Sequence, residues 1–490
     1  MTTETKQPGS AKFWRLTKPR WLILAAFLLL PVSLLGLRAY EILSTPDVGE
    51  PFDVEAFCAY RLPDEKNAFV HYRKVFELFV SEQKVLESHP SLNPQDFFDS
   101  VTAGQENWSR AIPAVREWVV LNRKSLDEWQ RGAACEENLL FPLDEAATAS
   151  AMDAVNVATR LTRHAQLESL EAMRLNSAGH PDEAWECYQI LLRASRHLAM
   201  HAPLMGPLVA GAVADLGVSG GVALASQKSV NAALLRKAIR DVEATEQMRT
   251  PPSDVIKVEY LALREVEKTG TVTGTTLPDW LRYTGYPAQI SRTARLVTAN
   301  LLSQADRPRY HRTGVHPGKL GLFELDPAAP PDPCLRPPEQ IERSAVNSAL
   351  TVAKALRPVA PETASDIEVC DPQSFAQNIH GAILVNDIVQ TRRSALLLAL
   401  ALQLHYREHR AFPTSLDELV KNGYLKAIPP DPFGKGEPFR YRREPGPRGA
   451  AVVWSVWIDG IDQGGLDLHS GADDWGLRVL APGTGQAPAK

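Results

Sequence analysis

The chain has 490 residues, of which 44% are hydrophobic, 23% charged and 7% aromatic. This length exceeds what one compact core usually holds, so we expect two or three domains. The composition is that of a globular protein and excludes a disordered or fibrous chain. The net charge is −5 at pH 7. An acidic chain without a basic stripe argues against nucleic acid as a partner.

An apolar segment close to the first residue predicts a membrane anchor. Residues 21–37 contain no charged side chain, and a helix of this length spans about 25 Å, close to the thickness of the hydrocarbon core. Residues 1–20 carry five basic side chains and one acidic one, which favours a cytoplasmic tail. We therefore predict a transmembrane helix over 21–38. A cleaved signal peptide is the alternative, although no small-x-small cleavage site follows.

Residues 39–303 are predicted to form a helical domain. Apolar side chains recur at helical spacing in a segment that starts after Pro63, with Asp64 as its N-cap, and in seven later segments. These later segments are 113–134, 152–178, 181–202, 206–226, 230–247, 252–268 and 287–303. The glycine and proline between 178 and 181 predict an αα-hairpin that resembles one tetratricopeptide-type repeat. We expect a mainly α fold of helical hairpins with tetratricopeptide-like packing.

The second half of the chain contains two proline-rich stretches. Residues 304–337 carry many prolines and little periodic apolar content, which is typical of a linker or a long surface loop. Residues 338–385 are predicted to contain one helix, over about 338–357, followed by an irregular connection.

A small α+β domain is predicted over residues 386–480, followed by a disordered tail over 481–490. An apolar helix over 391–409 precedes a short helix, for which Ser415 and Glu418 have the spacing of a capping box. Two strands, Phe439–Arg443 and Val452–Trp457, form a predicted hairpin. An acidic, glycine-rich loop follows the second strand.

This order of elements resembles the C-terminal domain of the major pseudopilin of type II secretion systems, protein G. The matching segments are 404–407 with Phe412-Pro413, 416–419, 423–425, 430–434, 441–442 and 455–460. The whole layout is similar to a group of large bacterial membrane-anchored proteins that carry this module after a helical region. The anchor lies far upstream of the module and lacks the glutamate that pseudopilins have there. The resemblance therefore implies the fold and not the role of a pilus subunit.

The resemblance also implies a calcium site in the last loop. Five aspartates lie there between glycines: Asp459, Asp462, Asp467, Asp473 and Asp474. Calcium takes six to eight oxygen ligands, and carboxylates with backbone carbonyls in such a loop can supply them. A solvated acidic loop is the alternative interpretation.

Catalytic motifs are weak in this chain. His405, Glu408 and His409 match a zinc-peptidase pattern, but no third ligand is evident, and His197 with His201 lacks an accompanying acid. The sequence contains no nucleophile elbow and no Walker loop. Its five cysteines form no CxxC pair, so reduced thiols or up to two disulfides remain as alternatives.

These observations predict a structural or protein-interaction protein of the bacterial envelope. It would be held in the inner membrane by one helix, with its N-terminus in the cytoplasm and its bulk outside, and would bind other envelope proteins. Two alternatives remain: an envelope hydrolase with a dispersed site, or an accessory component of type II secretion.

Overall fold

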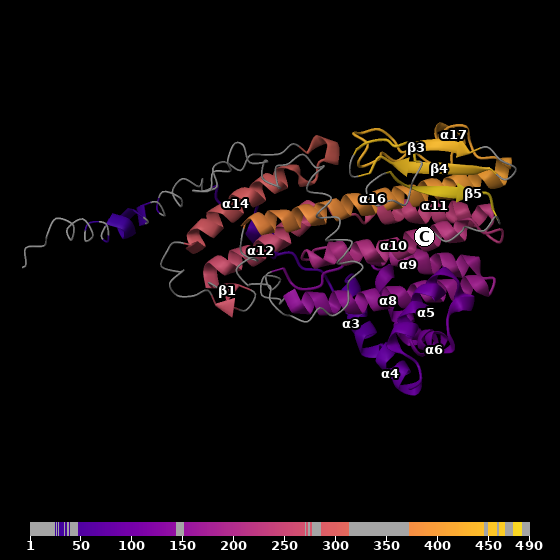
Figure 1. Ribbon diagram of the computed structural model, residues 1–490, viewed down its shortest axis with the longest axis horizontal. Helices are drawn as coiled ribbons and strands as arrows, with labels where there is room; N and C mark the ends of the chain where they lie inside the picture. Colours follow the sequence, from indigo (N-terminus) through magenta and orange to yellow (C-terminus); the bar gives the residue numbers. More distant parts are fainter. Residues whose placement is uncertain are drawn as a thin grey trace, which may run out of the picture.

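The computed structural model describes residues 48–143, 151–269, 271–272, 275–276, 286–312, 372–444, 449–457, 460–465 and 474–482, together with parts of 25–39. The described chain is mainly helical and carries a small three-stranded antiparallel sheet near its C-terminus (Figure 1). This confirms the predicted mainly α class with a small region of strands. Most of the predicted linker and the whole predicted helix over 338–357 lie outside the described residues.

Short helices form the N-terminal layer of the body. They are α2 (Val54–Cys58), α3 (Ala68–Leu78), α4 (Glu82–Ser88), α5 (Pro94–Glu106), η1 (Trp108–Arg110), α6 (Pro113–Leu121) and α7 (Arg123–Ala134). The N-cap of α3 is Asn67, whose side chain accepts a hydrogen bond from the Phe69 N–H, so the prediction of Asp64 was wrong. Asn67 can do this because its amide also bonds the backbone of Leu139 on a neighbouring segment.

The helix predicted over 113–134 is two helices, which meet at Asn122. This side chain is fully buried. Its Oδ1 accepts from the N–H of Val80 at 2.9 Å, and its Nδ2 donates to the carbonyl of Val80 at 3.0 Å. The amide thus satisfies both backbone groups of a residue outside any helix. The break follows from this tertiary contact and not from a glycine or proline.

Long helices follow along the chain: α8 (Ala151–Ser177), α9 (Pro181–Ala199), α10 (Met205–Ala225), α11 (Ala232–Gln247), α12 (Ser253–Thr269) and α14 (Tyr286–Ala305). All lie within a few residues of their predicted ranges. The turn between α8 and α9 has Gly179 at φ +87°, a conformation that glycine adopts without strain, and Pro181 begins α9. The predicted hairpin is confirmed. The short strands β1 (Thr271–Val272) and β2 (Thr275–Thr276) follow α12.

Helix α16 (Pro372–His409) runs through the body and joins it to the sheet (Figure 1). It begins well before residue 391, which corrects the predicted start, and the domain boundary predicted at 386 falls inside it. The early part of α16 places Ala382 and Ile383 in one apolar cluster with Val255, Ile256 and Ala294 of α12 and α14. Burial against these helices extends α16 backwards through a sequence of weak apolar periodicity.

The sheet has the order β3 (Arg440–Glu444), β4 (Ala450–Ser455) and β5 (Trp475–Leu480), all antiparallel. The first two strands were predicted as a hairpin. The third strand was not, because the segment before it is acidic and rich in glycine. The short helix α17 (Asp417–Lys421) lies beside the sheet, and its Glu418 accepts from the backbone and hydroxyl of Thr414. The predicted partner of Glu418 in the capping box, Ser415, was therefore wrong.

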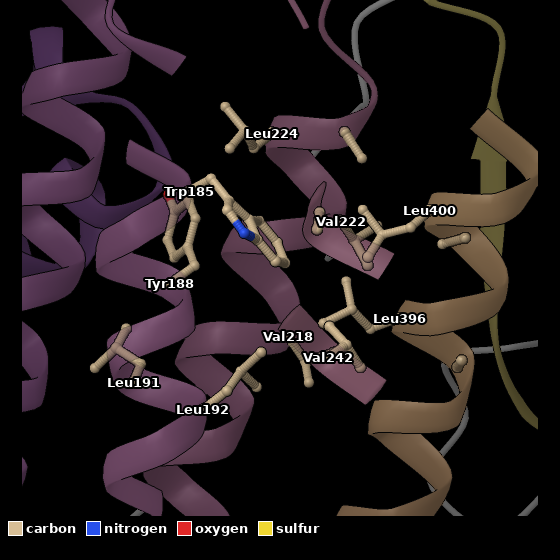
Figure 2. Packing of buried hydrophobic residues seen from close by; sticks show 14 of the residues in the cluster. Trp185, Tyr188, Leu191, Leu192, Val218, Val222, Leu224, Val242, Leu396 and Leu400 are labelled. Atoms are coloured by element: carbon tan, nitrogen blue, oxygen red, sulfur yellow. The ribbon is translucent and has the colours of Figure 1, made fainter. Parts of the chain in front are cut away.

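One hydrophobic core connects the helical body with the sheet. Figure 2 shows Trp185, Tyr188 and Leu192 of α9 packed between residues of α10, α11 and α16. The same cluster includes Ala451 and Val453 of β4. The C-terminal module therefore shares its core with the helices that precede it.

Helix α10 is long and apolar enough to cross a bilayer, yet 56% of its most apolar stretch is buried inside the protein. Half of the anchor predicted over 21–38 lies outside the described residues. The parts of it that are described are helical, and its large apolar side chains are exposed.

Candidate functional site

A hollow lies where the end of α9, the starts of α10 and α12, and the middle of α16 converge. Its volume is about 40 Å³, which is room for a few water molecules or a small ligand group. Most of its wall is apolar and made of small side chains and prolines: Ala199, Pro207, Ala210, Pro251, Pro252, Val255, Ala382 and Val389. The charged side chains in its lining are Arg196 and Arg393. We call this site the arginine pocket.

Arg393 is held rigidly on α16 with only part of its hydrogen-bonding capacity used. The residue is 2% exposed. Its Nη2 donates to the carbonyl oxygen of Leu192 at 3.1 Å and to the hydroxyl of Ser195. Its Nε and Nη1 have no hydrogen-bond partner among the described residues. The guanidinium thus keeps two unused donors in a buried position.

Arg196 on α9 also lines the pocket. It is 5% exposed, and its Nη2 lies 2.5 Å from Oε1 of Glu246 on α11. The same carboxylate oxygen is 3.9 Å from Nη1 of Arg393. Burial lowers the pKa of Arg196, and the charge of Glu246 opposes that shift. Two guanidinium groups therefore face one carboxylate.

Further unused donors complete the pocket. Arg196 Nε and Asn386 Nδ2 are buried, and neither has a hydrogen-bond acceptor among the described residues. Asn386 and Arg393 lie two turns apart on one face of α16, in a stripe that also contains Ala382 and Val389. The pocket therefore combines hydrogen-bond donors without acceptors and a largely apolar wall. This arrangement suits an anion that carries an apolar group.

The predicted calcium ligands are only partly described. Asp459, Asp467 and Asp473 lie outside the described residues. Asp462 accepts from Trp454 Nε1 at 3.0 Å and from the Gly464 N–H at 2.9 Å, and Arg440 Nε lies 3.3 Å from its other oxygen. Asp474 accepts from the Gly465 N–H at 2.7 Å. The two carboxylates thus hold the same short stretch of loop.

No group of three or more histidine, cysteine, aspartate or glutamate side chains that could hold a metal ion occurs in the described part of the chain. Burial opposes ionisation of Asp462, but the hydrogen bonds from Trp454 and Gly464 and the nearby Arg440 lower its pKa overall. Asp462 is therefore a carboxylate at neutral pH, already balanced by one cation. The calcium site stays a prediction.

The turn at 430–434, a main part of the pseudopilin resemblance, is built around Asp431. This carboxyl is fully buried and accepts from the N–H groups of Phe433 and Val456 and from the hydroxyl of Ser455, at 3.0, 3.1 and 2.6 Å. Burial raises its pKa, and these hydrogen bonds oppose the shift. Asp431 therefore joins the turn to the end of β4, and its role is structural.

Each side chain of the zinc-peptidase pattern has a structural partner. His405 Nδ1 donates to the carbonyl of Ala411 at 2.9 Å. His409 and Glu408 both contact the hydroxyl of Tyr424, at 3.1 and 2.6 Å, and Glu408 also pairs with Arg236. These contacts join the end of α16 to α11 and to the segment after α17.

The two histidines at the end of α9 differ in their surroundings. His201 lies 2.9 Å from Asp254 of α12, so the acid that the sequence did not reveal comes from another helix. His197 is fully buried between Tyr72 and the carbonyl of Cys135. Cys135 and Cys187 are thiols without a disulfide, while Cys334 and Cys370 lie outside the described residues.

The chain matches no protein-family model, no curated protein and no solved structure. Its likeness to the pseudopilin module therefore depends on the motifs quoted above.

Proposed function

We propose that this protein is a membrane-anchored, extracytoplasmic binding protein of the bacterial envelope, with one transmembrane helix and a non-enzymatic body. The observation that carries the proposal is the exposure of large apolar side chains in the segment over 21–38. Phe27 is 79% exposed, and Leu29, Leu30, Val32 and Leu35 are each more than 60% exposed. A contiguous apolar surface of this kind requires lipid or another protein to cover it.

Helix α10 supplies the contrast. It has a similar apolar composition, but its side chains pack against α9 and α16 within the core. The described residues of the first segment have no such partner inside the body, and a Cβ added at Gly36 would meet nothing within 4 Å. The five basic residues before the segment support a cytoplasmic N-terminus and an external body.

The C-terminal module supports binding and not assembly into a pilus. The helix of this module is the second part of α16, which is buried against α10 and α11 along much of its length. A pseudopilin-like helix that is covered in this way cannot pack against copies of itself. We infer that the module is a fixed part of the body and that the helical layers offer the surface for envelope partners.

Extraction of membranes at alkaline pH tests the anchor. The wild-type chain should stay in the membrane pellet, whereas the double substitution Leu29→Arg and Leu30→Arg should release it. Each arginine at the centre of a membrane helix costs about 2.5–3.5 kcal/mol. Val48→Arg, at an exposed position outside the segment, is the matched control and should leave the chain in the pellet. Release of the wild-type chain would contradict the proposed membrane anchor.

A further inference from the structure

The arginine pocket holds more positive charge than its neighbours balance. Arg196 and Arg393 are both at least nine-tenths buried, and both face Glu246, whose side chain is 27% exposed. An unpaired buried charge costs several kcal/mol, and proteins retain one when a partner repays that cost. The lining contains no acidic residue, so the partner has to come from outside the pocket.

We propose that the arginine pocket binds a small monoanion, namely a carboxylate carried by a short aliphatic group. This inference goes beyond the proposed function and does not depend on which side of the membrane the body lies.

The charge balance of the pocket favours a ligand with one negative charge. Among the buried and half-buried groups, two guanidinium groups face one carboxylate, which leaves one positive charge for one carboxylate to neutralise. Arg249 also acts on Arg196, but its side chain is exposed to solvent. A phosphate dianion would leave a net negative charge in a buried place. A cation would meet two arginines without a compensating acid in the lining.

Hydrogen bonding selects an acceptor. The buried groups without a hydrogen-bond partner in the described lining of the pocket are all donors: Nε and Nη1 of Arg393, Nε of Arg196 and Nδ2 of Asn386. A carboxylate has two oxygens with about four acceptor positions and no donor, and pairs well with the planar guanidinium. A neutral amide has one carbonyl oxygen and brings donors of its own, so it satisfies fewer of these groups.

Shape selects a short aliphatic group. Most of the rest of the wall consists of alanines, valines and prolines, with the two hydroxyl side chains Ser195 and Thr250. The hydroxyl of Ser195 already contacts Arg393, so the wall offers mainly apolar contact. A volume of about 40 Å³ is far below the roughly 300 Å³ at which pockets for drug-sized ligands begin. Such a group occurs in a free short-chain acid and at the carboxyl end of a peptide that terminates in valine. Both share the chemistry that the pocket recognises.

Isothermal titration of the purified full-length chain in detergent tests the proposal. The probes are sodium butyrate, the neutral isostere butyramide, the tripeptide Ala-Ala-Val and its C-terminal amide. We expect saturable heat with butyrate or with the free tripeptide, and none with butyramide or the amidated peptide. Binding of butyrate identifies a free acid, and binding of the tripeptide alone identifies a chain end. If neither binds, or if the neutral compounds bind equally well, the proposal is overturned.

A variant makes the location of the site testable. Asn386→Asp adds a negative charge to the pocket with almost no change in volume, so it should weaken binding of the anion by at least about tenfold, or 1.4 kcal/mol. Asn93→Asp makes the same change at the exposed N-cap of α5, where aspartate is equally suitable, and should leave binding unchanged. Melting temperatures of both variants show whether they fold. Equal affinity of the two folded variants for butyrate would place any binding outside this pocket and overturn the assignment.

Discussion

Tyr72 on α3 and His197 on α9 meet inside the core, with 2.8 Å between the phenolic oxygen and Nδ1 of the imidazole. On the other side of the ring, Nε2 lies 3.0 Å from the carbonyl oxygen of Cys135. A carbonyl can only accept, so Nε2 carries the proton, and the tyrosine hydroxyl donates to Nδ1. This neutral histidine joins the N-terminal layer to the central helices.

Acid should weaken this junction. Burial lowers the pKa of His197 to about 3 and that of His164, which bonds Ser125 and the carbonyl of Arg160, to about 4. Both values lie below the unfolded value of about 6.5. The stability that these neutral rings contribute is therefore complete above pH 6.5 and is lost as the pH falls towards 4 and 3.

Chemical denaturation at pH 7 and pH 5 checks the histidine prediction. Each buried histidine should lower the free energy of unfolding by about 1–2 kcal/mol between pH 7 and pH 5. Replacing His164 by glutamine removes its titration and should reduce the loss on acidification. An unchanged loss in this variant would contradict the prediction.

Glu168 should act in the opposite direction. Burial raises its pKa to about 8, although contacts with the Cys187 thiol and Gln130 oppose the shift. The folded protein therefore favours the protonated acid, and its stabilising effect is complete below pH 4.5 and is lost as the pH rises towards 8. Glu168→Gln keeps the shape without the titration. Between pH 5 and pH 8 the free energy of unfolding of the variant should rise by several kcal/mol relative to that of the wild type. A constant difference in the free energy of unfolding across that range would contradict this prediction.

The glycines of α10 should differ sharply from the glycine of α16 in their tolerance of alanine. A Cβ at Gly220 would lie 2.0 Å from Cε1 of Tyr188, whereas one at Gly381 would meet nothing within 4 Å. Gly220→Ala should therefore cost about 1–3 kcal/mol through overpacking. Gly381→Ala should be neutral or stabilise the helix by up to about 1 kcal/mol. Melting temperatures compare the two variants, and equal values would show that α10 packs differently.

Calcium binding is tested on the full chain by adding calcium and following its melting temperature. If the acidic loop binds the ion, the temperature should rise as calcium exceeds its dissociation constant. Replacing Asp467 and Asp473 by asparagine should abolish the rise. Magnesium, which demands a smaller and more regular site, is the control. A wild-type protein indifferent to calcium would leave the solvated acidic loop as the explanation.

Much of the helical architecture could be predicted because its signals are local. The helices α8 to α11 show the 3.6-residue apolar period, and glycine or proline marks the turn between α8 and α9. The break at Asn122 could not be predicted, since it depends on the backbone of Val80, 42 residues away. For the same reason the early part of α16, covered by α12 and α14, extends beyond its own periodic segment.

The arginine pocket could not be predicted from the sequence. Arg196 and Glu246 are 50 residues apart, and Arg393 lies 198 residues from its partner Ser195. Each of these charges lies in a helix where an exposed position is the usual interpretation. A weak signal exists in α16, where an asparagine and an arginine interrupt an otherwise apolar stripe. The meaning of that stripe depends on tertiary packing.

Digestion of intact spheroplasts by added protease tests on which side of the membrane the body lies. We expect the body, from residue 39 onwards, to be degraded together with a known periplasmic control, while a cytoplasmic control stays intact. Protection of the body until the spheroplasts are lysed would place it in the cytoplasm and contradict the proposed topology.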